Sequence, residues 1–147
     1  MIKESVDTTR SLAAIRQIRG AITSLHNGDY ECAVTLAHAA EGMIPDKKKD
    51  GDGKPLIKLM RERLPDDDPN LFSSWLKHPK GAEKATISVF EVVLMIARAI
   101  HKFVWYYEAS NDHFESFQDW AMLHGHLPKR ITERAEPEKA VIVTGSA

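Results

Sequence analysis

Residues 85–109 read ATISVFEVVLMIARAIHKFVWYYEA and include the most apolar stretch of the chain. Charged or titratable side chains interrupt this stretch at Glu91, Arg98, His101 and Lys102. A membrane span needs about 20 mostly uncharged apolar residues. The pattern therefore predicts a long helix inside a helical core and no membrane crossing.

The apolar side chains of this long helix cover most of its circumference. The polar ones form a narrow stripe of Ser88, Glu91, Arg98 and Lys102. A helix that is apolar over so wide an arc must be covered on several faces by its neighbours. We therefore expect three of its side chains to be buried in the core: Ile96, Ile100 and Phe103.

Two helices are expected before the long one, over residues 6–26 and 30–44. The first carries apolar side chains at steps of three and four, as one helix face requires: Ile15, Ile18, Ile22 and Leu25. The tripeptide at 27–29 separates the two helices. The second is rich in alanine, so another backbone can approach it closely, and we expect it at the centre of the fold. Its Cys32 is interpreted as a small buried residue with no reactive role.

Breaks and shorter helices fill the remainder. A charged loop at 46–53 is followed by a short helix from residue 54 or 55 to 64 and by a proline-flanked break at 65–69. A helical turn capped by Asn70 then runs through Leu76. Asp112 is expected to cap a last helix, which carries four large apolar side chains: Phe114, Phe117, Trp120 and Leu123.

These segments predict an all-α fold, an antiparallel bundle of four to five helices with short connections. The chain has 147 residues, the size of one domain. We expect a single helical bundle domain over residues 1–127 and a flexible C-terminal tail over residues 128–147.

Charge and cysteine content narrow the function classes. Lys and Arg total 20 against 21 Asp and Glu, a formal net charge of −1. Without a basic excess, binding of nucleic acid by bulk charge is not expected. A single cysteine excludes an internal disulfide framework and fits a reducing compartment. No apolar signal segment follows the first residues, so a cytoplasmic location is expected.

Candidate metal and catalytic groups are sparse. His38 and Glu41 are three residues apart and so share a helix face. Pairs of a carboxylate and a histidine at this spacing bind metal inside some helical bundles, but such a site needs a second pair. The long helix offers no such pair, and His38 also reads as part of a polar stripe. His124 and His126 flank a glycine at a helix end and could chelate a metal or simply form a loop. No cofactor, metal ligand or catalytic residue is assigned.

Two segments carry a resemblance to a known family. Residues 27–41 read NGDYECAVTLAHAAE, and residues 72–78 read FSSWLKH. A helix that opens Gly-Asp-Tyr and continues Thr-Leu-Ala-x-Ala-Ala-Glu, with a later Trp-Leu-Lys-His, resembles the HEPN-like helical proteins of bacteria. It is most similar to an uncharacterised branch with Asn-Phe-Phe-Lys-His at the matching place. The resemblance extends loosely over residues 15–123 and implies a bundle that often forms dimers.

The resemblance implies that four residues correspond to the family's signature residues and gather near one polar groove. They are His38, Glu41, Lys77 and His78. It favours an HEPN-like binding module whose groove holds a nucleotide, a small anion or a partner segment, with Lys77 supplying positive charge and the histidines hydrogen bonds. The alternative for Lys77 and His78 is that they offset the dipole at the end of a short helix.

Two further functions remain open. Members of the wider superfamily include RNA-cleaving toxins, in which an Arg is followed by a His after four to six intervening residues. Here Arg19 and His26 have that spacing but lie on the first helix, whereas Arg98 and His101 have only two residues between them. A ribonuclease toxin-like or metal-dependent bundle enzyme is thus the second hypothesis, and a purely structural interaction protein is the third.

Self-association is also expected. Residues 104–107 place four bulky side chains around more than a full helix turn, and the last helix adds Phe114, Phe117 and Trp120. Aromatic side chains are enriched in interface cores. We expect a two-fold homodimer, the commonest closed symmetry, with part of this aromatic cluster at the contact.

Overall fold

The computed structural model describes residues 4–46 and 71–128 and shows five helices in these ranges. They are α1 (Arg10–His26), α2 (Tyr30–Met43), α4 (Leu71–Lys77), α5 (Val89–Tyr107) and α6 (Asp112–Leu123). The described residues contain no strand, so the predicted all-α class is confirmed. Several predicted features lie outside the described residues: the charged loop at 46–53 beyond residue 46, the short helix from 54 or 55 to 64, the break at 65–69, the Asn70 cap, and the tail at 128–147 beyond residue 128.

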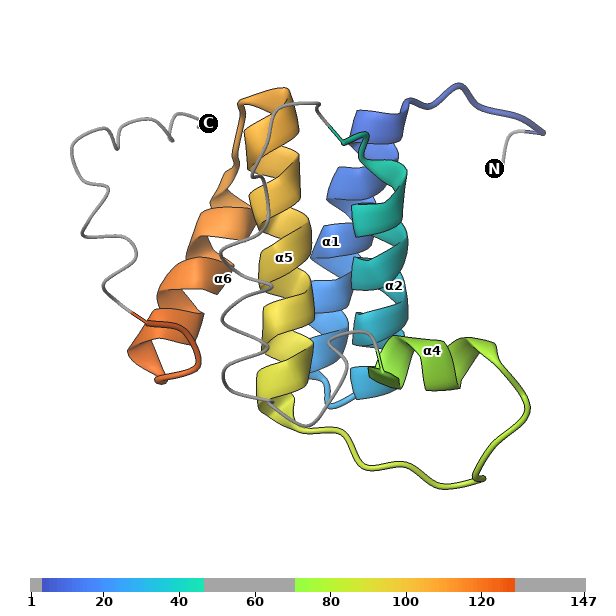
Figure 1. The fold of residues 1–147 in the computed structure, drawn as a ribbon. Helices are drawn as coiled ribbons and strands as arrows, with labels where there is room; N and C mark the ends of the chain where they lie inside the picture. The colour runs from blue at the N-terminus through green and yellow to red at the C-terminus, as the bar shows by residue number, and fades with distance from the viewer. Residues whose placement is uncertain (1–3, 47–70, 129–147) are drawn as a thin grey trace.

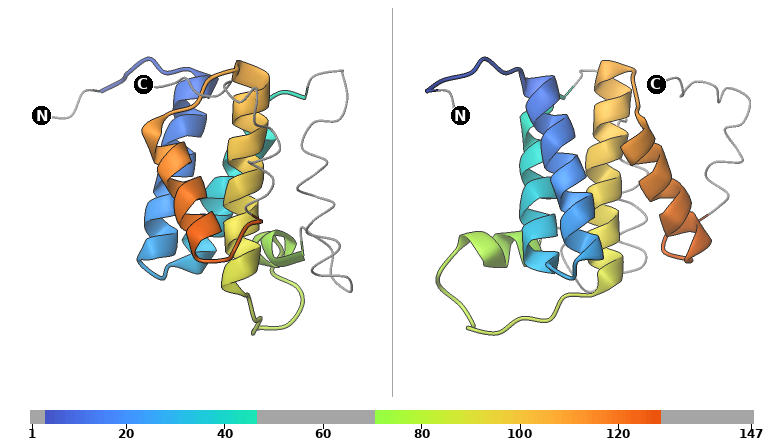
Figure 2. Two further views of the ribbon diagram at one scale, coloured as in Figure 1. Left: turned by 90° about the vertical axis from the view of Figure 1, so that its left-hand side faces the viewer. Right: turned by 180° about the vertical axis from the view of Figure 1, so that it is seen from behind.

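The helices α1, α2 and α5 stand side by side, α6 leans against α5, and α4 lies across α2 (Figure 1). Helix α1 runs opposite to α2 and α5, whereas α2 and α5 run in the same direction (Figures 1 and 2). The expected short connections are present at residues 27–29 and 108–111. The connection between α2 and α5 is longer and contains α4, and α5 starts at the same end of the bundle as α2 (Figure 1).

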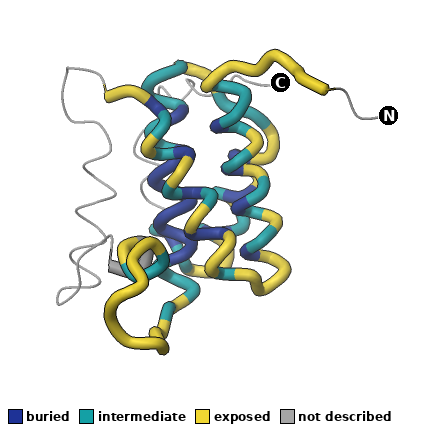
Figure 3. Tube along the Cα trace, turned by 90° about the vertical axis from the view of Figure 1, so that its right-hand side faces the viewer, coloured by how far each residue is buried: buried dark blue, intermediate teal, exposed yellow. Residues whose placement is uncertain are grey.

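The core forms where α1, α2 and α5 meet, and buried positions recur along their facing sides (Figure 3). From α1 and α2 it takes mostly small side chains: Ala14, Ala21, Ala33, Ala37 and Ala40. Gly20 belongs to the same contact, because a Cβ added there would lie 3.1 Å from Cδ1 of Leu36. Small residues thus bring α1 and α2 close together, as expected of an alanine-rich helix.

Helix α5 is buried without interruption from Val92 to Ile100. Ile96, Ile100 and Phe103 are all buried, which confirms the expectation for the core. Arg98, predicted as part of the narrow polar stripe of this helix, is also buried, at 7% exposure. None of the helices in the described residues has the length and apolar character that a membrane crossing requires.

Side-chain caps set three helix starts at residues other than those expected. Helix α1 begins at Arg10 and not at residue 6, since the Thr9 hydroxyl accepts a hydrogen bond from the Leu12 amide at 3.1 Å. Ser88 caps α5 in the same way, so α5 covers residues 89–107 in place of 85–109. Asn111 caps α6, and Asp112, the expected cap, is its first helical residue.

Glycine ends α1 in a Schellman turn. Gly28 has φ of +84°, its amide donates to the Leu25 carbonyl at 3.0 Å, and the Asp29 amide donates to the Ser24 carbonyl at 2.8 Å. This left-handed position suits glycine because it has no Cβ. At the end of α5 the left-handed residue is instead Glu108, with φ of +56°, which stores backbone strain.

The aromatic side chains near the chain end are more deeply packed than expected. Phe114 and Phe117 are buried inside the bundle and are not available to an interface. Trp120 is half-buried, with the rings of His26, His124 and His126 packed against its indole. Cys32, expected to be buried, is exposed.

Candidate functional site

A groove of about 330 Å³ lies between α2 and α4. Its walls are formed by Thr35, His38 and Ala39 of α2 and by Leu76 and Lys77 of α4. Two of the four residues singled out in the sequence, His38 and Lys77, are thus brought to one site. Lys77 lies 39 positions after His38 in the chain, so the packing of α4 across α2 creates the groove.

Helix α2 presents this wall because its other face is committed to the core. Ala33, Ala37 and Ala40 are fully buried. Residues 35, 38 and 39 follow the spacing of three and four that places side chains on one helix face. That face turns away from the alanine side, which leaves His38 half-buried and Thr35 exposed.

Helix α4 supplies the second wall with its C-terminal end. Lys77 is its last residue and is exposed, and the His78 amide donates to the Ser74 carbonyl at 3.2 Å. The Trp75 indole N–H donates to the Ala82 carbonyl at 2.9 Å, which ties the following segment back to the helix. His78 is exposed and does not line the groove.

The environment of His38 favours its neutral form. Burial lowers the pKa of His38 below its usual 6.5, and the positive charges of Lys77 and, more weakly, Arg98 lower it further. Glu41 acts in the opposite direction with a smaller effect than Lys77. The imidazole is therefore uncharged at neutral pH, and it offers one N–H donor and one ring-nitrogen acceptor.

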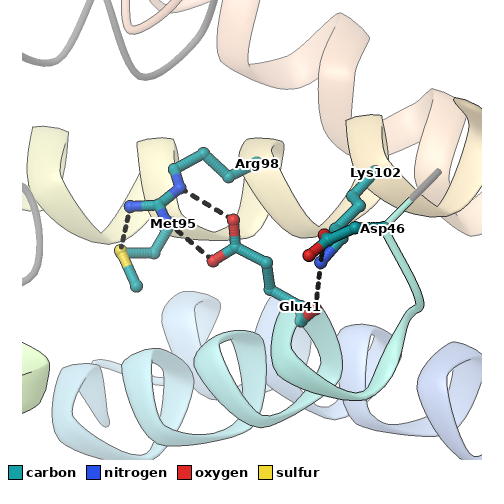
Figure 4. Close-up of polar contacts among 5 residues, drawn as sticks. All are labelled: Glu41, Asp46, Met95, Arg98 and Lys102. Atoms are coloured by element: carbon teal, nitrogen blue, oxygen red, sulfur yellow. Dashed lines mark hydrogen bonds and ion pairs between the residues drawn. The ribbon is translucent and has the colours of Figure 1, made fainter. Parts of the chain in front are cut away.

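Glu41 is not directed into the groove but across to α5 (Figure 4). Its carboxylate accepts a hydrogen bond from Nε of Arg98 at 3.0 Å and forms an ion pair with a terminal guanidinium nitrogen at 2.9 Å. The other terminal nitrogen donates to the sulfur of Met95 at 3.6 Å. This two-point contact holds the guanidinium in a fixed plane and links α2 to α5.

A second polar link holds the C-terminal end of α2 (Figure 4). The Lys102 ammonium donates to the backbone carbonyl of Glu41 at 3.0 Å and forms an ion pair with Asp46 at 2.8 Å. The hydrogen bond and the charge of Lys102 together hold the pKa of Asp46 below its usual value. The wall of the groove is thus anchored to α5 at two successive points.

Sequence reasoning named two of the five described residues that line this groove and missed the other three. It named His38 and Lys77, but it placed Glu41 and His78 in the same groove, where neither is a lining residue. It missed Thr35, Ala39 and Leu76. The sequence carried one sign of the ion pair between Glu41 and Arg98. Arg98 lies within the most apolar helix, and a buried charged side chain needs a partner of opposite charge.

The arrangement bears on the other two chemistries considered. Arg98, which a ribonuclease would use with His101, is engaged by Glu41. Among the described residues, no group of three or more His, Cys, Asp or Glu side chains is placed to hold a metal ion. His124 and His126 pack their rings on Trp120, with centroid distances of 5.1 and 5.2 Å.

No protein-family model, curated protein or solved structure matches this chain.

Proposed function

We propose that this protein is a binding module that holds a small anion in the groove between α2 and α4. The observation that carries the proposal is the meeting of His38 and Lys77, from two separate helices, on the walls of one groove. Lys77 supplies the positive charge, and His38 and Thr35 supply hydrogen bonds to the bound anion.

The local field supports an anionic ligand. Around His38, the effect of Lys77 on the pKa exceeds the opposing effect of Glu41, and Arg98 acts in the same direction as Lys77. Within the part of the chain that the structure describes, no carboxylate pairs with Lys77. Its ammonium can therefore meet a ligand without first breaking an ion pair, unlike the cations of Arg98 and Lys102.

The proposal includes an HEPN-like bundle that acts as a homodimer in the cytoplasm. The resemblance of residues 27–41 and 72–78 supports the family, and the packed helices within residues 10–43 and 71–123 are compatible with it. On α6, the exposed Leu123, at 77%, lies three residues after the half-buried Trp120 and so on the same helix face, and we propose that a second copy covers this face. The exposed thiol of Cys32 fits a reducing compartment.

Binding is favoured over ribonuclease chemistry for a structural reason. To stabilise a phosphodiester transition state, the Arg98 guanidinium would have to leave the carboxylate of Glu41, although the Arg98 side chain is only 8% exposed and that of Glu41 only 16%. Removing one partner from such a pair leaves an uncompensated buried charge. Lys77 and His38 need no such rearrangement.

A thermal-shift experiment tests the proposal with inorganic phosphate, AMP, acetate and octanoate. A ligand at a hundredfold excess over its Kd stabilises the folded state by about 2.7 kcal/mol, which raises the Tm by about 5–10 °C for a domain of this size. We expect at least one anion to produce such a shift in the wild type. The shift should disappear in Lys77→Met.

The matched control is Lys80→Met, because Lys80 is also exposed but lies outside the groove. It should keep the full shift. Equal shifts in wild type and Lys77→Met, or no shift with any anion, would refute the anion site and leave the structural interaction protein as the better hypothesis. RNA cleavage that survives purification and is lost in Arg98→Met would favour the enzyme.

A further inference from the structure

The geometry points to a monocarboxylate with an apolar body as the ligand class of the α2–α4 groove. This inference rests on the proposed function and narrows it from any small anion to one chemical class. It is carried by three properties of the groove: its size, the chemistry of its walls, and the number and placement of its charged groups.

The size of the groove exceeds what a bare inorganic anion needs. At about 330 Å³, it falls at the lower end of the roughly 300–1,000 Å³ typical of sites for organic ligands. A phosphate or sulfate ion held by Lys77 and His38 would leave part of this volume unfilled. A ligand with an organic body as well as an acidic group can fill it.

The walls of the groove are apolar over much of their surface. Ala39 of α2 and Leu76 of α4 contribute side chains with no polar atom, and Leu76 packs at its inner side against the core. Contact between apolar surface of this kind and a hydrocarbon chain or ring removes both from water, which favours binding. Such a surface offers nothing to the ribose hydroxyls of a nucleotide.

The charged groups suit a single negative charge. Among the described residues that line the groove, Lys77 is the one with a cationic side chain, while His38 and Thr35 are neutral donors at neutral pH. A phosphate monoester carries about −1.5 to −2 charges and three acceptor oxygens. A carboxylate carries one charge on two oxygens, which one ammonium and one N–H or O–H donor can satisfy.

Helix orientation reinforces this selection. Helix α4 meets the groove at its C-terminal end, where Lys77 is the last residue. Backbone carbonyls at a helix C-terminus carry partial negative charge. They offset part of the Lys77 charge, which disfavours a dianion more strongly than a monoanion. Sites for phosphate usually use the opposite helix end.

Isothermal titration with acetate, butanoate, hexanoate and octanoate tests the inference. Full burial of one methylene strengthens binding about fourfold, and an open groove gives a smaller gain. We expect affinity to rise about two- to fourfold per methylene along the series. Lys77→Met should weaken octanoate binding by roughly 10–100-fold, the effect of losing a charge-assisted hydrogen bond, and Lys80→Met should not weaken it.

Inorganic phosphate, AMP and 1-octanol complete the experiment and separate the two proposals. Lys77-dependent binding of phosphate or AMP, with no gain along the carboxylate series, would overturn the monocarboxylate class and leave the anion site intact. Binding of 1-octanol as tight as that of octanoate would show that charge plays no part and would overturn both proposals. Absence of binding by every probe would also overturn both.

Discussion

Replacing Glu41 with alanine should destabilise the bundle by about 3–5 kcal/mol. The Glu41 carboxylate makes two contacts with Arg98, at 3.0 and 2.9 Å, and the side chains are only 16% and 8% exposed. A hydrogen bond to a charged group contributes about 1.5–3 kcal/mol. Two such contacts, lost together while the guanidinium stays buried, account for the expected range, which matches the cost of breaking a buried pair.

A double-mutant cycle measured by urea unfolding checks this prediction. Arg98→Met replaces the cation with an unbranched, flexible apolar side chain. Glu41→Ala combined with Arg98→Met should recover most of the stability lost in Glu41→Ala alone, because the buried guanidinium that Glu41→Ala leaves unpaired is then absent. The two substitutions should therefore be strongly non-additive, with a coupling energy above about 1.5 kcal/mol.

The ion pair between Lys102 and Asp46, just after the end of α2, provides the control. Asp46 is 86% exposed in its pair with Lys102, and exposed pairs contribute about 0–1 kcal/mol. Asp46→Ala should thus cost less than about 1 kcal/mol. If Glu41→Ala cost no more than Asp46→Ala, or if the double variant were as unstable as the sum of its single substitutions, the burial argument for Glu41 and Arg98 would be wrong.

Three further predictions concern pH, strain and assembly. Because the pKa of His38 is lower in the folded state than its usual 6.5, the unfolded state binds more protons in the window below that value. The stability that depends on neutral His38 is therefore complete above pH 6.5 and is lost as pH falls through the folded-state pKa. Urea unfolding between about pH 5 and pH 7.5 should show this loss in wild type and a flatter profile in His38→Gln; parallel profiles would contradict it. Glu108→Gly should raise the free energy of unfolding by up to about 1 kcal/mol, since glycine relieves the left-handed strain at φ +56°; a fall in the urea midpoint would refute that reading. Sedimentation at micromolar concentration should show a dimer that Leu123→Asp converts to a monomer, because the proposed contact uses the α6 face on which the exposed Leu123 and the half-buried Trp120 are neighbours; a wild-type monomer would contradict the proposed dimer.

The helices could be predicted from the sequence because each depends on local pattern. The apolar run at 85–109 and the spacing of Ile15, Ile18 and Ile22 indicate two of the helices without reference to any other part of the chain. The starts were less accurate, because capping depends on the extended backbone of Thr9 and Ser88, which periodicity does not report.

Contacts between distant segments were beyond the sequence. Periodicity shows that α5 must be covered, but not that α2 lies beside it in the same direction. Periodicity assigned Arg98 to the polar stripe and gave no sign of its burial. The carboxylate that makes the burial possible belongs to Glu41, 57 positions away in the sequence. The groove had the same difficulty: His38 and Lys77 were brought together by resemblance, and Thr35 and Leu76 carried no local signal of their role.

The most direct measurement is an NMR titration of the His38 imidazole in isotopically labelled protein, with His38→Gln used to assign the resonance. The pKa of His38 should lie below 6.5 in the free wild type. It should rise in Lys77→Met, which lacks the neighbouring ammonium, and rise in the wild type when an anion from the thermal-shift panel binds. The resonance of His113, exposed on α6, should not move when the anion is added. A His38 titration curve unchanged by both the substitution and every anion would contradict an anion-binding groove formed by α2 and α4.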